Sequence, residues 1–105
     1  MDYPENVKEM INDFQFLTDW EDRYMHVIDM GKLLPSLNAT EKTDTNKVKG
    51  CVSQVWLISN MSDGPDPMLN FRGDSDAHIV KGLVAITLEI FSNRKASEIL
   101  SLNAI

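Results

Sequence analysis

The sequence of 105 residues is poor in cysteine, in basic side chains and in uninterrupted apolar segments. It contains 10 basic and 16 acidic residues, so its formal charge is −6, and a surface of that sign repels the phosphates of nucleic acids. The single thiol, Cys51, excludes an intrachain disulfide, a Cys-x-x-Cys redox pair and any metal site built from cysteines alone. Because small secreted domains usually carry disulfides, their absence favours a reducing compartment.

Targeting and membrane signals are also missing from the sequence. Residues 1–8 carry charges of both signs instead of the apolar run of a signal peptide. The most apolar stretch, residues 79–91, contains Lys81 and Glu89 and is shorter than the roughly 20 apolar residues of a membrane span. We therefore expect a cytoplasmic protein in which residues 1–105 form a single domain.

Apolar periodicity predicts two helices in the first third of the chain, over about 4–16 and 19–30. Thr18 and Glu21 have the spacing of a capping box at the start of the second helix, and Gly31 is placed to end it. The apolar stripe of the second helix, which we expect to lie in the core, consists of Trp20, Tyr24, Val27 and Ile28.

The middle of the chain predicts a β-hairpin after a polar loop. Residues 52–58 are mostly β-branched, aliphatic or aromatic, and the turn formers at 62–67 lead to a second alternating segment at about 69–72. Because two strands alone are marginally stable, a third short strand at about 46–49 would strengthen the sheet.

Two helices are predicted after the hairpin. Asp74 or Ser75 is placed to cap an apolar helix that runs to about Phe91 and lies at the centre of the domain. A last short helix covers 96–102, with Leu100 expected to face inward. The predicted fold class is α+β, with helices covering a small antiparallel sheet of two to three strands, in the order α-α-β-β-α-α.

Cys51 is the first candidate for chemistry. It follows Gly50, which can adopt a positive φ, and it lies close in sequence to Lys47 and Lys49. A cysteine reacts as the thiolate, which nearby positive charge and solvent access promote. The alternative is that Cys51 is a small buried hydrophobic residue.

Other kinds of site have weaker support. His26 and His78 lie in predicted helices beside aspartates, which does not favour a nucleophilic pair with the thiol. Cys51, Asp74, Asp76 and His78 could ligate zinc by type but lack a compact ligand spacing, so we expect no metal. The five glycines are scattered and form no phosphate-binding loop, so we expect no cofactor.

Two longer motifs resemble the SufE family of sulfur acceptors, which assist a cysteine desulfurase in iron-sulfur cluster assembly. These motifs are residues 48–57, VKGCVSQVWL, and residues 73–83, GDSDAHIVKGL. The upstream segments 20–24, WEDRY, and 30–35, MGKLLP, are similar to early segments of the family. The match covers most of the chain in the same order.

The resemblance implies that Cys51 accepts sulfur from the persulfide of a SufS-like, PLP-dependent cysteine desulfurase. It implies further that the protein stimulates that enzyme and passes the sulfur to a downstream iron-sulfur scaffold. The chain would then be a sulfur-transfer accessory protein and not a stand-alone enzyme. Two alternatives are an adaptor that binds a desulfurase or scaffold and uses Cys51 structurally, and a thiol redox sensor.

The resemblance also suggests residues that contact the partner or support the cysteine. These candidates are Gly50, Ser53, Trp56, Asp74, Ser75 and Asp76. We expect the free Cys51 to turn inward against Val55 and Trp56, and Arg23 to be a partner contact or an internal ion-pair residue. Family members continue with further helices beyond the point that matches Ile105. Without them the apolar helix 79–91 would be partly exposed, which favours a homodimer.

Overall fold

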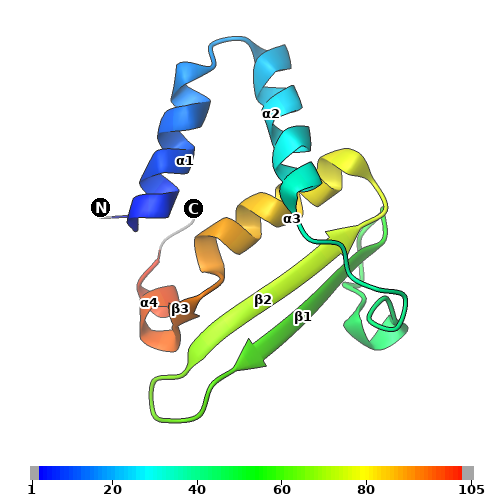
Figure 1. The fold of residues 1–105 in the computed structure, drawn as a ribbon, viewed down its shortest axis with the longest axis vertical. Helices are drawn as coiled ribbons and strands as arrows, with labels where there is room; N and C mark the ends of the chain where they lie inside the picture. The colour runs from blue at the N-terminus through cyan, green and yellow to red at the C-terminus, as the bar shows by residue number, and fades with distance from the viewer. Residues whose placement is uncertain (1–2, 103–105) are drawn as a thin grey trace.

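Three antiparallel strands and four α-helices make up residues 3–102, the part of the chain that the computed structural model describes (Figure 1). The elements are α1 (Glu5–Phe16), α2 (Trp20–Leu33), the 3-10 turn η1 (Asp44–Asn46), β1 (Val55–Met61), β2 (Met68–Ser75), α3 (His78–Phe91), β3 (Arg94–Lys95) and α4 (Ala96–Ser101). The predicted α+β class and the order of the main helices and strands are confirmed.

The sheet has the strand order β1-β2-β3. β1 and β2 pair along their whole length, and β3 adds two residues to the far edge of β2 near Met68. The prediction of a third strand at 46–49 is wrong, because that segment contributes only an isolated bridge between Lys47 and Trp56. The third strand instead follows α3, after Asn93 reverses the chain with a left-handed φ of 59°.

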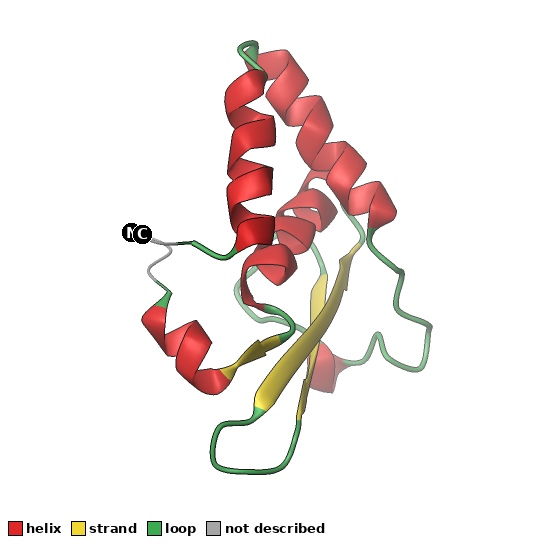
Figure 2. Ribbon diagram, turned by 60° about the vertical axis from the view of Figure 1, so that its left-hand side comes forward, coloured by secondary structure: helices red, strands yellow, loops and turns green. Residues whose placement is uncertain are grey.

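Helix α3 lies between α2 and the sheet, as Figures 1 and 2 show. Two glycines allow α2 and α3 to cross with their backbones in contact: a Cβ on Gly82 would lie 2.1 Å from the carbonyl oxygen of Val27. A Cβ on Gly31 would lie 2.7 Å from the Gly82 nitrogen. The prediction that Gly31 ends the second helix is therefore wrong; α2 continues to Leu33, and this glycine serves the helix crossing.

The predicted caps of α2 and α3 also differ from the structure. Asp19 occupies the N-cap of α2 without a side-chain hydrogen bond, so the expected Thr18–Glu21 capping box does not form. The N-cap of α3 is Ala77. Asp74 and Ser75 are the last residues of β2 and serve the site described below.

Two large apolar side chains, one at the start of α2 and one on α4, are exposed. Trp20, expected in the core, is 80% exposed near the connection where α1 and α2 diverge, and Leu100 on α4 is 86% exposed. The Arg23 Nε donates to the Leu17 carbonyl at 2.7 Å and ties the α1–α2 connection. Arg23 makes no ion pair within residues 3–102, so the expected internal ion pair is wrong, and a contact with a partner stays a prediction. No helix within residues 3–102 is long and apolar enough to cross a membrane.

Candidate functional site: the Cys51 loop

The segment that carries the only thiol, residues 48–54, is referred to as the Cys51 loop. Its base is closed on one side by the Lys47–Trp56 bridge and by the Val48 amide, which donates to the Val55 carbonyl at 2.8 Å. The loop therefore begins and ends at neighbouring backbone positions on the outer edge of β1. This arrangement holds both ends of the loop together and leaves its tip beyond the end of the sheet (Figure 1).

The tip of the Cys51 loop is exposed. Gly50 has a φ of +86°, so the predicted need for glycine at this turn is confirmed, and a Cβ built on it would meet no atom within 4 Å. Cys51 and Val52 are exposed. The expected inward orientation of the thiol is wrong for this structure. Ser53 is half-buried and makes no hydrogen bond within residues 3–102.

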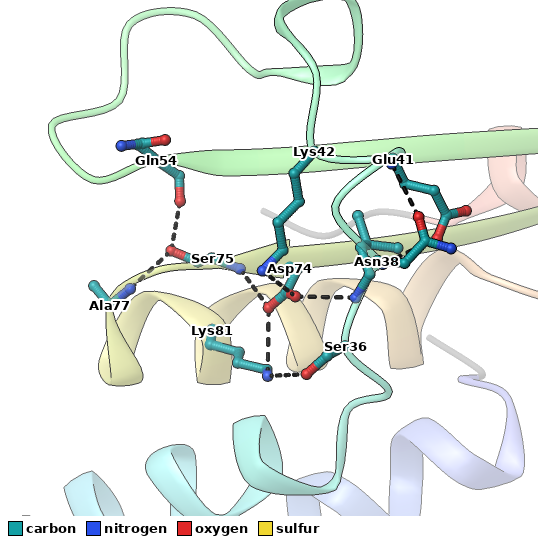
Figure 3. Close-up of polar contacts among 10 residues, drawn as sticks. Ser36, Asn38, Glu41, Lys42, Gln54, Asp74, Ser75, Ala77 and Lys81 are labelled. Carbon is teal, nitrogen blue, oxygen red and sulfur yellow. Dashed lines mark hydrogen bonds and ion pairs between the residues drawn. The ribbon is translucent and has the colours of Figure 1, made fainter.

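Ser75, the last residue of β2, and Asp76, which follows it, hold the carboxyl end of the loop. The Gln54 amide donates to Asp76 Oδ1 at 3.0 Å, and the Asp76 amide donates to the Gln54 carbonyl at 3.3 Å. The Ser75 hydroxyl donates to the same carbonyl at 2.8 Å and accepts from the Ala77 amide (Figure 3). Asp76 and Ser75, both predicted as loop-supporting candidates, thus fix the backbone three residues after Cys51.

Asp74 lies at the centre of a second set of contacts, the Asp74 cluster, formed with Leu37, Lys42, Ser75 and Lys81. Asp74 as a whole residue is only 1% exposed. Its Oδ2 accepts from the Leu37 amide at 3.0 Å, and its Oδ1 accepts from the Ser75 amide at 2.8 Å. The ammonium groups of Lys42 and Lys81 lie 3.4 Å and 3.3 Å away (Figure 3). One carboxylate therefore joins the loop after α2, the end of β2 and the first turns of α3.

The contacts of Asp74 keep it ionised. Burial by itself would raise the pKa of the carboxyl group, but the Leu37 and Ser75 amides and the Lys81 ammonium outweigh burial and lower the pKa of Asp74 below its ordinary value. A negative charge with two amide donors and two cations is well satisfied, as a buried charge must be. Asp74 thus acts as a structural anchor for these three segments.

Trp56 supports the base of the loop. Its indole is buried, and the Lys42 ammonium lies 5.3 Å from the ring centroid in a cation–π contact. Trp56 also faces Asp74 in the β1–β2 register, so the same lysine bridges the aromatic ring and the carboxylate. Trp56 thereby links the Cys51 loop to the Asp74 cluster.

Leu37 and Lys42 had no sequence signal, because neither lies in a motif. Gln54 lies within the motif at 48–57, but nothing in that motif marks its role in holding the loop. Only the contacts in the folded protein show that Leu37 and Lys42 bind the buried Asp74 carboxylate at the end of β2. Within residues 3–102 no group of three or more metal-ligating side chains could hold a metal ion. His26 packs edge-on against Phe14, with ring centroids 4.8 Å apart.

An apolar pocket of about 230 Å³ opens between β1 and α3, beside the base of the loop. Its lining residues are Val48, Val55, Leu57, Val80, Leu83, Val84, Thr87 and Leu88. Leu57 and Leu83 remain partly exposed at its rim. The pocket lies at the base of the Cys51 loop, and Val52, the residue after the thiol, is fully exposed.

The fold and the site define a small α+β domain that presents one exposed thiol from a tethered loop at the end of a three-stranded sheet. Residues 8–105 match the family model "SufE: Fe-S metabolism associated domain". The chain therefore belongs to the SufE family and is associated with iron-sulfur metabolism.

Two relatives extend this comparison. The chain is 52% identical over 101 residues to an uncharacterized SufE-like protein of Rhizobium meliloti. The aligned residues make up 95% of this chain and 72% of that relative. The chain is also 54% identical over 100 residues to an uncharacterized SufE-like protein of Rhizobium etli. That alignment covers 94% of this chain and 68% of the relative. The resemblance seen in the two cysteine-proximal motifs is thus confirmed over nearly the whole chain.

Proposed function

We propose that the protein is a sulfur acceptor and carrier in iron-sulfur cluster assembly, with Cys51 as the accepting residue. The Cys51 thiolate attacks the terminal sulfur of a persulfide on the active-site cysteine of a PLP-dependent, SufS-like desulfurase. The S–S bond of the donor breaks, its electron pair leaves on the donor cysteine as a thiolate, and the transferred sulfur forms a new persulfide on Cys51. No external oxidant or reductant is needed, because the sulfane sulfur only changes its partner.

The observation that carries this proposal is the exposed thiol on a loop that is anchored at both ends. Attack on a donor sulfur requires access, which an exposed Cys51 at a loop tip provides. The hydrogen bonds to Gln54 and the Lys47–Trp56 bridge hold the base of that loop, so the thiol is presented from a defined place.

The count of one cysteine supports carriage of the sulfur. A second nearby thiol could attack the Cys51 persulfide, form a disulfide and release sulfide. The sequence contains no second cysteine, so this internal loss cannot occur. The sulfur therefore remains on Cys51 until an external acceptor, such as an iron-sulfur scaffold, receives it.

Stimulation of the desulfurase follows from the same exchange. Each transfer returns the donor cysteine to its thiolate form and frees it for another turnover. The protein acts here as an accessory with a covalent intermediate and not as a stand-alone enzyme. A purely structural Cys51 is disfavoured because an exposed side chain contributes little packing.

The test is incubation of the 105-residue chain with a SufS-like desulfurase, PLP and free cysteine, followed by intact mass spectrometry. We expect a mass gain of one sulfur atom per chain, with faster cysteine turnover than the desulfurase shows alone. Cys51→Ser should abolish both effects, and Ser101→Ala, at an exposed serine at the end of α4, serves as the matched control that should retain them. Absence of the mass gain in the unmodified chain, or its persistence in Cys51→Ser, would contradict the proposal.

The redox-sensor alternative has its own readout. A sensor cysteine would be oxidised by peroxide much faster than a thiol in an unstructured peptide. We expect an ordinary oxidation rate, because no ion pair or hydrogen bond within residues 3–102 engages the Cys51 side chain.

A further inference from the structure

The edge of β2 that faces away from β1 is only partly paired. β3 pairs with Met68 and Leu69 and, within residues 3–102, no strand pairs with this edge beyond them. At the next outward position a side chain takes the place of a strand: the Ser92 hydroxyl accepts from the Phe71 amide at 2.8 Å and donates to the Phe71 carbonyl at 3.2 Å. Figure 1 shows β3 beside only the first part of β2. The line of partners along this edge therefore stops at Phe71.

Gly73 is the next residue of β2 whose backbone points outward. The Ser62 amide donates to the Met68 carbonyl and the Asp76 amide donates to the Gln54 carbonyl, so the even-numbered residues of β2 form the hydrogen-bonded pairs with β1. The amide and the carbonyl of Gly73 consequently face away from β1. Within residues 3–102 no hydrogen bond engages either group, although Gly73 is buried. Buried backbone groups of folded proteins are nearly always paired, so these two groups require a partner from outside the chain.

A pocket of about 440 Å³, referred to as the β2-edge pocket, opens along this edge. It is lined by Phe71 and Gly73 on β2, by residues 33–36 at the end of α2, and by Ala85 and Leu88 on α3. Its volume lies within the roughly 300–1,000 Å³ of ligand sites, which combine apolar walls with a few placed polar groups. Here the helices supply the apolar walls and Gly73 supplies a donor and an acceptor.

The unpaired groups of Gly73 are complementary to one peptide residue. They offer one donor and one acceptor, so a ligand that satisfies both must present one acceptor and one donor. An extended residue antiparallel to β2 does so, because the two residues of a hydrogen-bonded antiparallel pair exchange both N–H···O bonds. A hydrocarbon would leave both groups unpaired, and a simple ion would match only one of the two partial charges. Charge complementarity therefore favours peptide backbone as the occupant.

The surroundings of Gly73 also determine which side chain the ligand residue carries. A Cβ on Gly73 would lie 2.8 Å from Cγ1 of Val84 in α3, so this position faces the helical layer. Residues directly opposite each other in an antiparallel pair project to the same face, so the ligand side chain would enter the part of the pocket walled by α2 and α3. Met30, Ala85 and Leu88 line that part. An apolar side chain fits these walls, whereas a charged one would lose its hydration there.

We propose that the β2-edge pocket binds an extended segment of a partner protein, antiparallel to β2, with an apolar residue opposite Gly73. The amide of that residue donates to the Gly73 carbonyl, and its carbonyl accepts from the Gly73 amide. The segment continues the line of β3 past Ser92, on the edge of the sheet opposite to the one from which the Cys51 loop extends. In such strand addition the backbone provides affinity and the side-chain pocket provides specificity. The proposal does not depend on sulfur transfer, so either can fail alone.

The test uses the acetylated and amidated tripeptide Ala-Leu-Ala as the probe. It is titrated to about 10 mM into the isotope-labelled 105-residue chain, and the backbone amides are followed by NMR. Because one residue pair covers little surface, we expect a dissociation constant of about 1 to 10 mM. The Gly73 amide should shift and its hydrogen exchange should slow severalfold, whereas the Leu100 amide on α4 should do neither. A Gly73 amide that does not respond at the highest probe concentration would overturn the proposal.

Two changes to the probe test the two components of the site without altering the protein. Replacing the leucine N–H by an ester oxygen removes the bond to the Gly73 carbonyl and should weaken binding about three- to tenfold. Replacing the leucine by aspartate places a charge against the apolar walls and should weaken binding at least about tenfold. Equal affinity of the ester and the amide would reject pairing with Gly73, and equal affinity of the aspartate probe would reject the apolar side-chain site.

A substitution at the rim tests the location. Leu33→Ser removes an apolar side chain that lines the pocket and is 85% exposed, and it should weaken probe binding about threefold. Leu100→Ser is the matched control, because Leu100 is 86% exposed on α4 and should leave the affinity unchanged. Equal effects would show non-specific apolar association and reject the site. The circular dichroism spectrum of each variant verifies that it is folded.

A second copy of this chain is the alternative occupant of the pocket. It predicts that the Gly73 amide of the free chain becomes more protected from hydrogen exchange as the chain concentration rises. We expect protection that is independent of chain concentration, and a concentration-dependent increase would overturn the proposal of a partner segment.

Discussion

The Asp74 cluster and the Cys51 loop occupy the same end of the β1–β2 hairpin but differ in construction. The Asp74 cluster is buried and joins three segments through amide donors and two ammonium groups. The Cys51 loop is exposed and, among the contacts of residues 3–102, is held at its two ends. The difference shows how a small domain can place a reactive atom in solvent while fixing the position from which it extends.

Asp74→Ala should produce the largest loss of stability, because it leaves the Leu37 and Ser75 amides and the Lys81 ammonium without their acceptor. We expect the free energy of unfolding to fall by about 3 kcal/mol. Urea denaturation followed by circular dichroism measures this change. The matched control is Asp76→Ala, whose carboxylate is exposed and which should cost less than about 1 kcal/mol. Equal losses of unfolding free energy for the two variants would contradict the stated difference between the Asp74 cluster and the Cys51 loop.

Acid should weaken the Asp74 cluster. The pKa of Asp74 is lowered in the folded state, so its charge stabilises the fold above the ordinary value of 3.8, and that contribution is lost as the pH falls from about 5 through the folded-state pKa. The free energy of unfolding of Asp74→Asn should therefore depend less on pH in this window. Urea titrations at several pH values between about 2 and 7 measure both slopes. Identical slopes would show that Asp74 gains nothing from its partners.

Gly50→Ala should have a smaller effect that arises from the backbone alone. The added methyl group meets no atom, but alanine at a φ of +86° is strained, and we expect a loss of about 1 kcal/mol. Gly50→Asn should lose less, because asparagine tolerates the left-handed region. Thermal unfolding of the two variants gives this comparison. A neutral Gly50→Ala would mean that the tip of the loop adopts another conformation.

Asp76→Asn should have the smallest effect on global stability and a local effect on the loop. The amide side chain weakens the acceptor for the Gln54 amide, and we expect a loss of less than about 0.5 kcal/mol. Hydrogen exchange of the Gln54 amide should accelerate severalfold, whereas the amide of Ile58 in β1 should be unaffected. Equal acceleration at both positions would indicate that Asp76 stabilises the sheet and not the loop.

The elements that depend on local pattern were predictable from the sequence. The first helix was expected to span about 4–16 and spans Glu5–Phe16, and the turn formers at 62–67 do connect the two strands. The resemblance to the SufE family identified Ser75 and Asp76, and the structure shows them holding the carboxyl end of the Cys51 loop. Their identity was visible in the motif, but their contact with Gln54 was not.

The remaining features depend on neighbours that are distant in the sequence. Gly31 has the local signature of a helix stop, and only the crossing of α3 at Gly82 explains why α2 continues past it. Asp74 followed by Ser75 has the signature of a helix cap, but the Leu37 amide, 37 residues earlier, accounts for the buried carboxylate. Trp20 fits an apolar stripe, although the packing of α3 does not cover the start of α2. In each case the same local motif is compatible with two tertiary environments.

The two tryptophans of the chain differ in a way that gives the site its own optical signal. Trp56 is buried at the base of the Cys51 loop beneath Lys42, whereas Trp20 is exposed at the start of α2. A water-soluble quencher such as iodide should therefore remove the fluorescence of Trp20 first. Trp20→Phe would leave Trp56 as the single fluorophore. Its emission would then report, in real time and without a label, any change at the base of the loop when Cys51 gains or loses a sulfur atom.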